Sequence, residues 1–225
     1  MAFPDHSFVL LALSKTASTT LERALAPYAS WVISSPPGMK HLGAQGFERK
    51  IAPQLAASGH PRQSYEVVTM FRDPIAWLES WWRYRARHSL AERRPHKSTA
   101  DVSFEDYARS YIAEDGRAPT PKGRPARFLT VDGVVGVDRI LAVDRPDVWQ
   151  NFFAERLGRP LEFERRNVSS APVNGELSAA TRAALRAYLA PEYTVWDRLA
   201  ESGQWTGACG TPLPVAARSA RGMRT

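Results

Sequence analysis

The feature that most constrains the fold is the stretch of residues 8–25, where an apolar run stops abruptly at a cluster of small polar residues. Residues 8–13 are all apolar and too few to span a membrane, which is typical of a strand buried on both faces. Residues 14–20 are small or hydroxylic apart from one lysine, and residues 21–25 favour a helix. The predicted order is therefore strand, tight turn and helix.

This turn has the composition of an anion-binding site. The first N–H groups of a helix have no partner within the helix, and the helix dipole places about half a positive charge there. Lys15 adds a full charge, and Thr16, Ser18, Thr19 and Thr20 add hydroxyl groups. A helix cap needs only one hydroxyl, so the number of donors favours a bound phosphate over simple capping.

The turn differs from the loop with which many nucleotide-binding proteins wrap a triphosphate. That loop would carry glycine where this chain has Val9 and Ser14, and only its Lys-Thr ending is present, as Lys15 and Thr16. We therefore expect a shorter loop that holds a 5′-phosphate group.

Composition limits the remaining possibilities. The 225 residues carry a formal net charge of +7, and basic residues are concentrated in segments 83–97 and 117–127, so a small anionic ligand or an acidic acceptor explains the charge as well as nucleic acid does. The single Cys209 excludes an intramolecular disulfide and a multi-cysteine zinc site, and we expect no metal. No basic secretory leader or apolar run long enough to span a membrane is present, so we expect a cytoplasmic location.

Periodicity and breaker residues predict the other elements, and we expect one domain of residues 1–206 followed by a disordered basic tail of residues 207–225. Basic, proline-containing residues 83–101 are interpreted as a mobile lid, and 116–127 as a second basic loop. The predicted strands are 31–34, 65–71, 128–131 and 139–143, and the predicted helices are 43–57, 74–85, one beginning at Ser103, 147–157, 179–189 and 192–199.

A second candidate anion site follows the strand predicted at 65–71. Arg72 stands at the strand end, Asp73 is a suitable N-cap for the helix that Pro74 begins, and Ser80 lies about two helical turns further on. Arg72 and Ser80 are suited to share one phosphate, although Arg72 could instead pair with a neighbouring acid on the surface. Ligands of open α/β sheets bind at the carboxyl ends of strands, so one nucleotide could bridge both sites.

His41 is the third candidate. It lies between a Pro/Gly turn and a predicted helix, in the kind of loop where catalytic residues gather. A lone histidine is more often structural, and its imidazole could equally cap a helix or pack against the core.

The two anion motifs together resemble those of a known family. Residues 14–21 resemble the phosphosulfate-binding loop of sulfotransferases, and Phe71-Arg72-Asp73-Pro74 followed by Ser80 resembles their 3′-phosphate-binding segment. Residues 81–85, 167–169 and 177–178 are also similar to bacterial members, so the resemblance covers about residues 8–200.

The resemblance implies an α/β fold like that of P-loop NTPases, with three layers and a central parallel β-sheet flanked by helices. It implies 3′-phosphoadenosine 5′-phosphosulfate as the donor and a hydroxyl or amine of a small molecule or glycan as the acceptor. Lys15 would polarise the bridging oxygen, and His41 would act as the general base, with Glu48 or His60 as the next candidates. The donor would be held by Lys15, Thr16, Ala17, Ser18, Thr19, Thr20, Arg72 and Ser80.

The chain departs from the family at one point, because many members carry glycine where it has Ala17 or Ser18. We therefore expect an ordinary helical turn at these two residues. Two other functions stay open: an ATP-dependent phosphotransferase of the P-loop type, and a nucleotide-binding protein without turnover.

Overall fold

The computed structural model describes residues 1–87, 92–121, 123–163 and 176–214. They fall into two compact units, and the single domain predicted for residues 1–206 stays a prediction. Unit 1 comprises residues 1–72, 125–166 and 194–213, and unit 2 comprises residues 73–124, 167–193 and 214–225.

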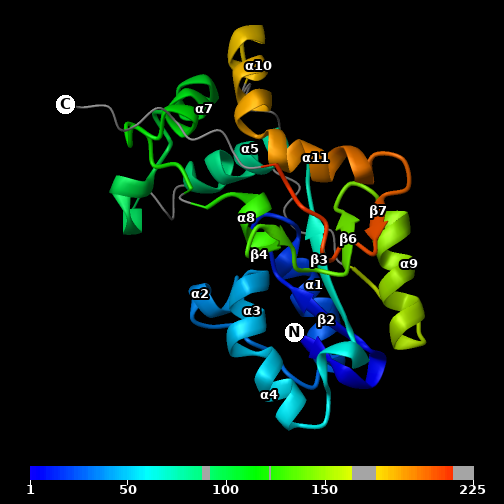
Figure 1. The fold of residues 1–225 in the computed structure, drawn as a ribbon. Coiled ribbons are helices and arrows are strands. Elements are labelled where there is room, and N and C mark those ends of the chain that lie inside the picture. Colours follow the sequence, from blue (N-terminus) through cyan, green and yellow to red (C-terminus); the bar gives the residue numbers. More distant parts are fainter. Residues whose placement is uncertain (88–91, 122, 164–175, 215–225) are drawn as a thin grey trace, which may run out of the picture. The chain divides into compact units, whose positions relative to one another are not determined.

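Unit 1 contains a mixed five-stranded sheet in the order β1-β2-β3-β6-β7 (Figure 1). The three central strands run parallel to one another, and both outer strands are antiparallel to their neighbours. Leu11 on β2 lies opposite Thr69 on β3, so these two strands end side by side. The strands are β1 (Ala2–Phe3), β2 (Phe8–Leu11), β3 (Glu66–Phe71), β6 (Arg139–Ala142) and β7 (Gln204–Thr206).

Helices cover both faces of this sheet, as Figure 1 shows. Alternate residues of each central strand enter opposite apolar clusters: Phe8 and Leu10 pack with α1 and α9, whereas Val9 and Leu11 pack with α3, α4, α8 and the end of α11. This two-sided burial explains the unbroken apolar run of β2. The unit 1 helices are α1 (Ser18–Leu25), α2 (Pro37–Lys40), α3 (Ala44–Lys50), α4 (Ala52–Ala57), α8 (Pro125–Leu129) and α9 (Pro146–Leu157), and α11 (Ala190–Leu199) enters unit 1 at residue 194.

Three predicted elements of unit 1 were wrong in detail. The helix predicted over 43–57 breaks at Ile51, because Pro53 in the first turn of α4 has no N–H to continue the helix of α3. Of the strand predicted at 128–131, residues 128 and 129 end α8, and the other two form β4 (Thr130–Val131), which pairs with β5 (Val134–Val135) in a short hairpin. The segment 31–34 forms only one bridge, between Trp31 and Ala2.

The residues after β7 belong to unit 1 as far as residue 213. The Ala208 N–H donates to the Asp138 carbonyl oxygen at 3.2 Å, and the Val135 N–H donates to the Thr211 carbonyl oxygen at 2.8 Å. Part of the expected tail thus extends the β4–β5 hairpin, whereas residues 215–225 lie outside the described residues.

Unit 2 is helical in its described residues, with α5 (Pro74–Arg85), α7 (Phe104–Ala113) and α10 (Ala179–Tyr188). The side chains of Asp73, Ser103 and Ser178 each accept a backbone N–H in the first turn of their helix, which confirms the predicted Asp73 cap and the predicted helix starts at Ser103 and residue 179. Glu105 on α7 accepts from the Ser178 hydroxyl at 2.9 Å, which ties α7 to α10.

Both predicted basic loops are partly packed. In the segment interpreted as a lid, Thr99 is buried and its hydroxyl donates to the Trp82 carbonyl oxygen at 2.7 Å. In the second loop, Arg124 forms an ion pair with Glu192, which is completely buried. Arg124 therefore neutralises a buried carboxylate. This role differs both from a solvent-exposed loop residue and from a phosphate ligand.

Candidate functional site at the carboxyl edge of the parallel strands

The predicted phosphate site lies at the carboxyl edge, the side of the sheet where β2 and β3 end. The chain leaves β2 at Leu11 and enters α1 at Ser18, so residues 12–17 form the connecting turn. Within it Lys15 has φ +69° and Ala17 has φ +60°. Left-handed residues in a turn direct successive N–H groups toward one point, as in the nests that bind anions.

The left-handed Ala17 contradicts the expectation of an ordinary helical turn. An L-residue in this conformation costs about 1 to 2 kcal/mol, since its Cβ approaches the following carbonyl oxygen. This turn holds two such residues, Lys15 and Ala17, two positions apart, without glycine at either. Such strain persists only where the surrounding structure imposes it, and it is concentrated at functional sites.

The first turn of α1 presents backbone donors to this edge. Ala17 is the N-cap residue, and its methyl group offers no acceptor. The first helical bond runs from the Leu21 N–H to the Ala17 carbonyl oxygen at 3.0 Å. The amides of Ser18, Thr19 and Thr20 precede that bond, so their partner must come from outside the helix.

Thr16 has a different role from the one predicted. Its side chain is buried, and its hydroxyl donates to the Leu13 carbonyl oxygen at 2.8 Å. The hydroxyl proton is therefore used to close the turn, and the expected donation from this hydroxyl to a phosphate is replaced by a bond within the loop.

His41 reaches the same edge from the end of α2. Its Nδ1 lies 2.7 Å from the carbonyl oxygen of Ala12, the first residue after β2. A carbonyl oxygen only accepts, so Nδ1 carries the proton, and in the neutral imidazole Nε2 is then the basic nitrogen. The His41 imidazole, in one defined tautomer, therefore lies against Ala12, which is three positions before Lys15 in the same turn.

An acid on α1 holds the segment that carries His41, and sequence reasoning missed it. Glu22 accepts a hydrogen bond from the Ser34 hydroxyl at 2.5 Å and forms an ion pair with Lys40. Burial acts to raise the pKa of Glu22, but the hydrogen bonds from Lys40 and Ser34 outweigh it and lower the pKa below the ordinary value. No local pattern marks Glu22, because both partners lie more than ten residues away.

The second predicted motif is divided between the units. Arg72 follows β3 directly, and the register of β2 with β3 places it at the carboxyl edge with the turn. Neighbouring strands lie about 4.8 Å apart, so the two segments begin side by side. Ser80 is in α5 and belongs to unit 2, so its contact with Arg72 stays a prediction.

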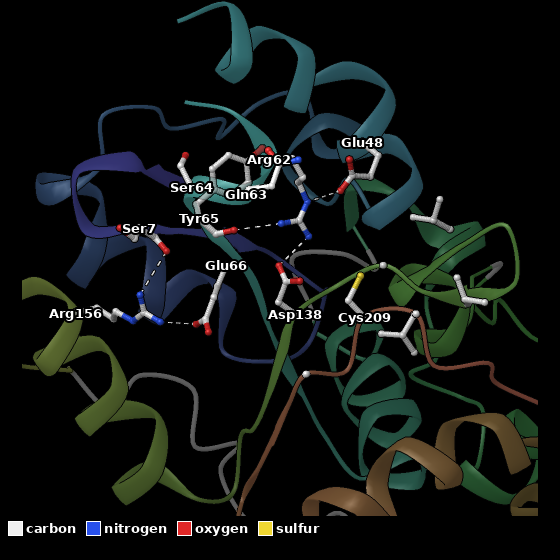
Figure 2. A pocket seen from close by; sticks show the side chains of 16 residues that line it. Ser7, Glu48, Arg62, Gln63, Ser64, Tyr65, Glu66, Asp138, Arg156 and Cys209 are labelled. Atoms are coloured by element: carbon white, nitrogen blue, oxygen red, sulfur yellow. Dashed lines mark hydrogen bonds and ion pairs between the residues drawn. The ribbon is translucent and has the colours of Figure 1, made fainter. Parts of the chain in front are cut away.

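A cavity of about 1000 Å³ lies at the opposite end of the strands, which we call the amino edge. Figure 2 shows that its charged side chains point toward one another. Arg62 donates to Glu48 at 2.9 Å and to Asp138 at 2.7 Å, and Asp138 also accepts the Val67 N–H at 2.7 Å. Arg156 and Glu66 form a second pair at 2.5 Å.

The two alternative candidates for the general base, Glu48 and His60, lie toward the amino edge. Glu48 is paired with Arg62 at the amino edge, away from the turn that follows β2. His60 precedes β3 in the chain and so stands near the beginning of that strand. Of the three candidate bases, His41 is the one that the structure places at the carboxyl edge.

Comparisons of the chain with protein-family models, curated proteins and solved structures found no match. None of the described helices is long and apolar enough to cross a membrane. Within the same described ranges, no group of three or more histidine, cysteine or acidic residues is arranged to hold a metal ion. A function for this chain is therefore inferred from its own residues.

Proposed function

We propose that this protein is a sulfotransferase that uses 3′-phosphoadenosine 5′-phosphosulfate, with a P-loop-like arrangement of strand, turn and helix as its donor site. The acceptor is a hydroxyl or amine of a small molecule or glycan. The observation that carries the proposal is the turn of residues 12–17, where left-handed Lys15 and Ala17 lead into an α-helix beside His41.

The residues at the carboxyl edge fit a phosphate in three respects. Left-handed residues and an alanine N-cap leave the amides of Ser18, Thr19 and Thr20 to an outside acceptor. Lys15 adds a positive charge within the same turn, and Arg72 is the first residue after β3, the strand next to β2. Arg72 and Ser80 are proposed to take the 3′-phosphate, and the hydroxyls of Ser18, Thr19 and Thr20 supplement the amides at the 5′-phosphate.

The donor supplies an activated sulfuryl group when it is bound. His41 Nε2 takes the proton that the acceptor gives up as its oxygen or nitrogen bonds to sulfur. Lys15 and the first amides of α1 stabilise the negative charge left on phosphate when its bond to sulfur breaks. Because positioning and charge stabilisation suffice by analogy with phosphoryl transfer, these residues need no covalent intermediate.

The primary test is calorimetric titration with 3′-phosphoadenosine 5′-phosphate, with ATP and ADP as competitors. Arg72→Ala removes charge-assisted hydrogen bonds, so we expect affinity to fall about 10- to 100-fold. Arg49→Ala removes the same charge from an exposed position on α3 and should leave affinity unchanged. Absence of binding by the wild type, or equal affinity in Arg72→Ala, would overturn the proposal, and tighter binding of ATP would favour a phosphotransferase.

Turnover is tested with labelled donor and a lysate as the source of acceptors. Wild-type protein should transfer label, and His41→Ala should lower the rate while its affinity for the 3′,5′-bisphosphate is retained. Binding without any transfer would identify a nucleotide-binding protein instead of an enzyme. Full activity in His41→Ala would assign the base to another residue.

A further inference from the structure

The segment that carries His41 is fastened to the helix that begins at the phosphate turn. Glu22 lies in the second turn of α1, and its two carboxylate oxygens bind different parts of the segment: one accepts from Ser34 and the other pairs with Lys40. About four-fifths of each side chain of the ion pair is removed from solvent. Since Lys40 precedes His41 directly, the ion pair restrains the backbone from which the imidazole projects.

From this geometry we infer that Glu22 is a positioning residue that sets the orientation and tautomer of the His41 ring. The catalytic part of this inference rests on the proposed function, in which His41 is the general base. The structural part concerns only the contacts of Glu22 and the His41–Ala12 hydrogen bond.

The His41 ring is oriented by the contact of its Nδ1 with the Ala12 carbonyl oxygen. A free neutral histidine exchanges between two tautomers, and a carbonyl acceptor at 2.7 Å selects the form with its proton on Nδ1. The contact requires the end of α2 to stay against the end of β2, across 29 residues of sequence. α2 has only four residues, so its position depends on contacts such as those with Glu22.

Besides Lys40, the Met1 ammonium also interacts favourably with the Glu22 carboxylate. Lys40 and Ser34 supply the hydrogen bonds. Replacing Glu22 by glutamine keeps the shape and an acceptor for Ser34 but removes the charge that holds Lys40. The variant therefore tests the ion pair with little change in packing.

The first measurement needs no donor. Nitrogen NMR of the imidazole should show the Nδ1–H tautomer of His41 in the wild type and a mixture of tautomers in Glu22→Gln. Lys40→Met, which breaks the pair from the other side, should give the same mixture. Glu66→Gln is the control, since it breaks part-buried ion pairs at the amino edge and should leave the His41 signals unchanged.

The second measurement separates positioning from binding. In Glu22→Gln we expect kcat to fall about 10- to 100-fold, because a misplaced base loses its alignment. Affinity for 3′-phosphoadenosine 5′-phosphate should stay that of the wild type. The double variant Glu22→Gln with Lys40→Met should be no worse than either single variant, since both remove one contact.

The inference is overturned if His41 keeps the Nδ1–H tautomer in Glu22→Gln, or if Glu66→Gln lowers kcat equally. Circular dichroism at the assay temperature verifies that each variant is folded. A wild type that binds no bisphosphate would refute the proposed function while leaving the NMR result on Glu22 intact, so the two failures are distinguishable.

Discussion

The two ends of the parallel strands in unit 1 use polar groups in opposite ways. At the amino edge, Arg62 binds both Glu48 and Asp138, and Arg156 binds Glu66, so the cavity is lined by charges that already have partners. At the carboxyl edge, backbone strain and an alanine N-cap leave helix amides for an outside acceptor.

This difference separates two uses of positive charge. A guanidinium paired with two carboxylates stabilises the fold and offers little to a ligand, because a ligand would have to displace a partner already in place. Amides at a helix N-terminus have a fixed direction and no competing partner within the helix. The cavity at the amino edge is therefore a weaker candidate for anion binding than the turn of residues 12–17.

The largest predicted change tests the carboxyl edge and is a loss of turnover on replacing Lys15. Lys15→Ala should lower turnover about 10²- to 10³-fold, the usual loss when one charge-stabilising group is removed from a reaction centre. Affinity for 3′-phosphoadenosine 5′-phosphate should fall much less. Lys50→Ala, at an exposed position of α3, serves as the control in steady-state assays with labelled donor. Equal losses in both variants would contradict the role of the turn.

At the amino edge the expected effect is on stability. Asp138→Ala removes the acceptor of both Arg62 and the Val67 N–H, so the free energy of unfolding should fall by about 2 to 3 kcal/mol. Urea denaturation measures this change, and bisphosphate affinity should be unaffected in the folded variant. Asp147→Ala, at an exposed ion pair on α9, should have little effect. A loss of affinity in Asp138→Ala would mean that the two edges are coupled.

The left-handed Ala17 allows a smaller and sharper test. Ala17→Gly relieves the unfavourable φ of +60° but loosens the unfolded chain, so stability should rise by up to about 1 kcal/mol. Ala24→Gly makes the same substitution inside α1 and should lower stability by about 0.5 to 1 kcal/mol. Thermal denaturation compares the two, and changes of the same sign would show that Ala17 is unstrained.

The smallest predicted change is in how the free energy of unfolding depends on pH, through the carboxylate of Glu22. The pKa of Glu22 is lowered by folding, so this carboxylate stabilises the folded state above its ordinary pKa of 4.5, and the contribution is lost as the pH falls through the lower folded-state value. The free energy of unfolding, measured from pH 6 to 3, should decline less steeply in Glu22→Gln than in the wild type. Identical slopes would show that Lys40, Ser34 and the Met1 ammonium do not favour the charged form.

Features that depend on neighbouring residues could be predicted from the sequence. The apolar strand β2, the Asp73, Ser103 and Ser178 caps, and the order of strand, turn and helix each follow from residues within a few positions of one another. The caps are formed by the local chain, and the apolar run of β2 is a local pattern although the strand it pairs with lies 58 residues away.

The tertiary structure decided the rest. Ala17 is left-handed, Thr16 turns its hydroxyl to Leu13, and His41 meets Ala12 because β2, α1 and α2 are packed together. Glu22 and Arg124 find partners 12 to 68 residues away. In an extended chain each charge has many equivalent partners, and only the packing within each unit brings one of them within hydrogen-bond distance.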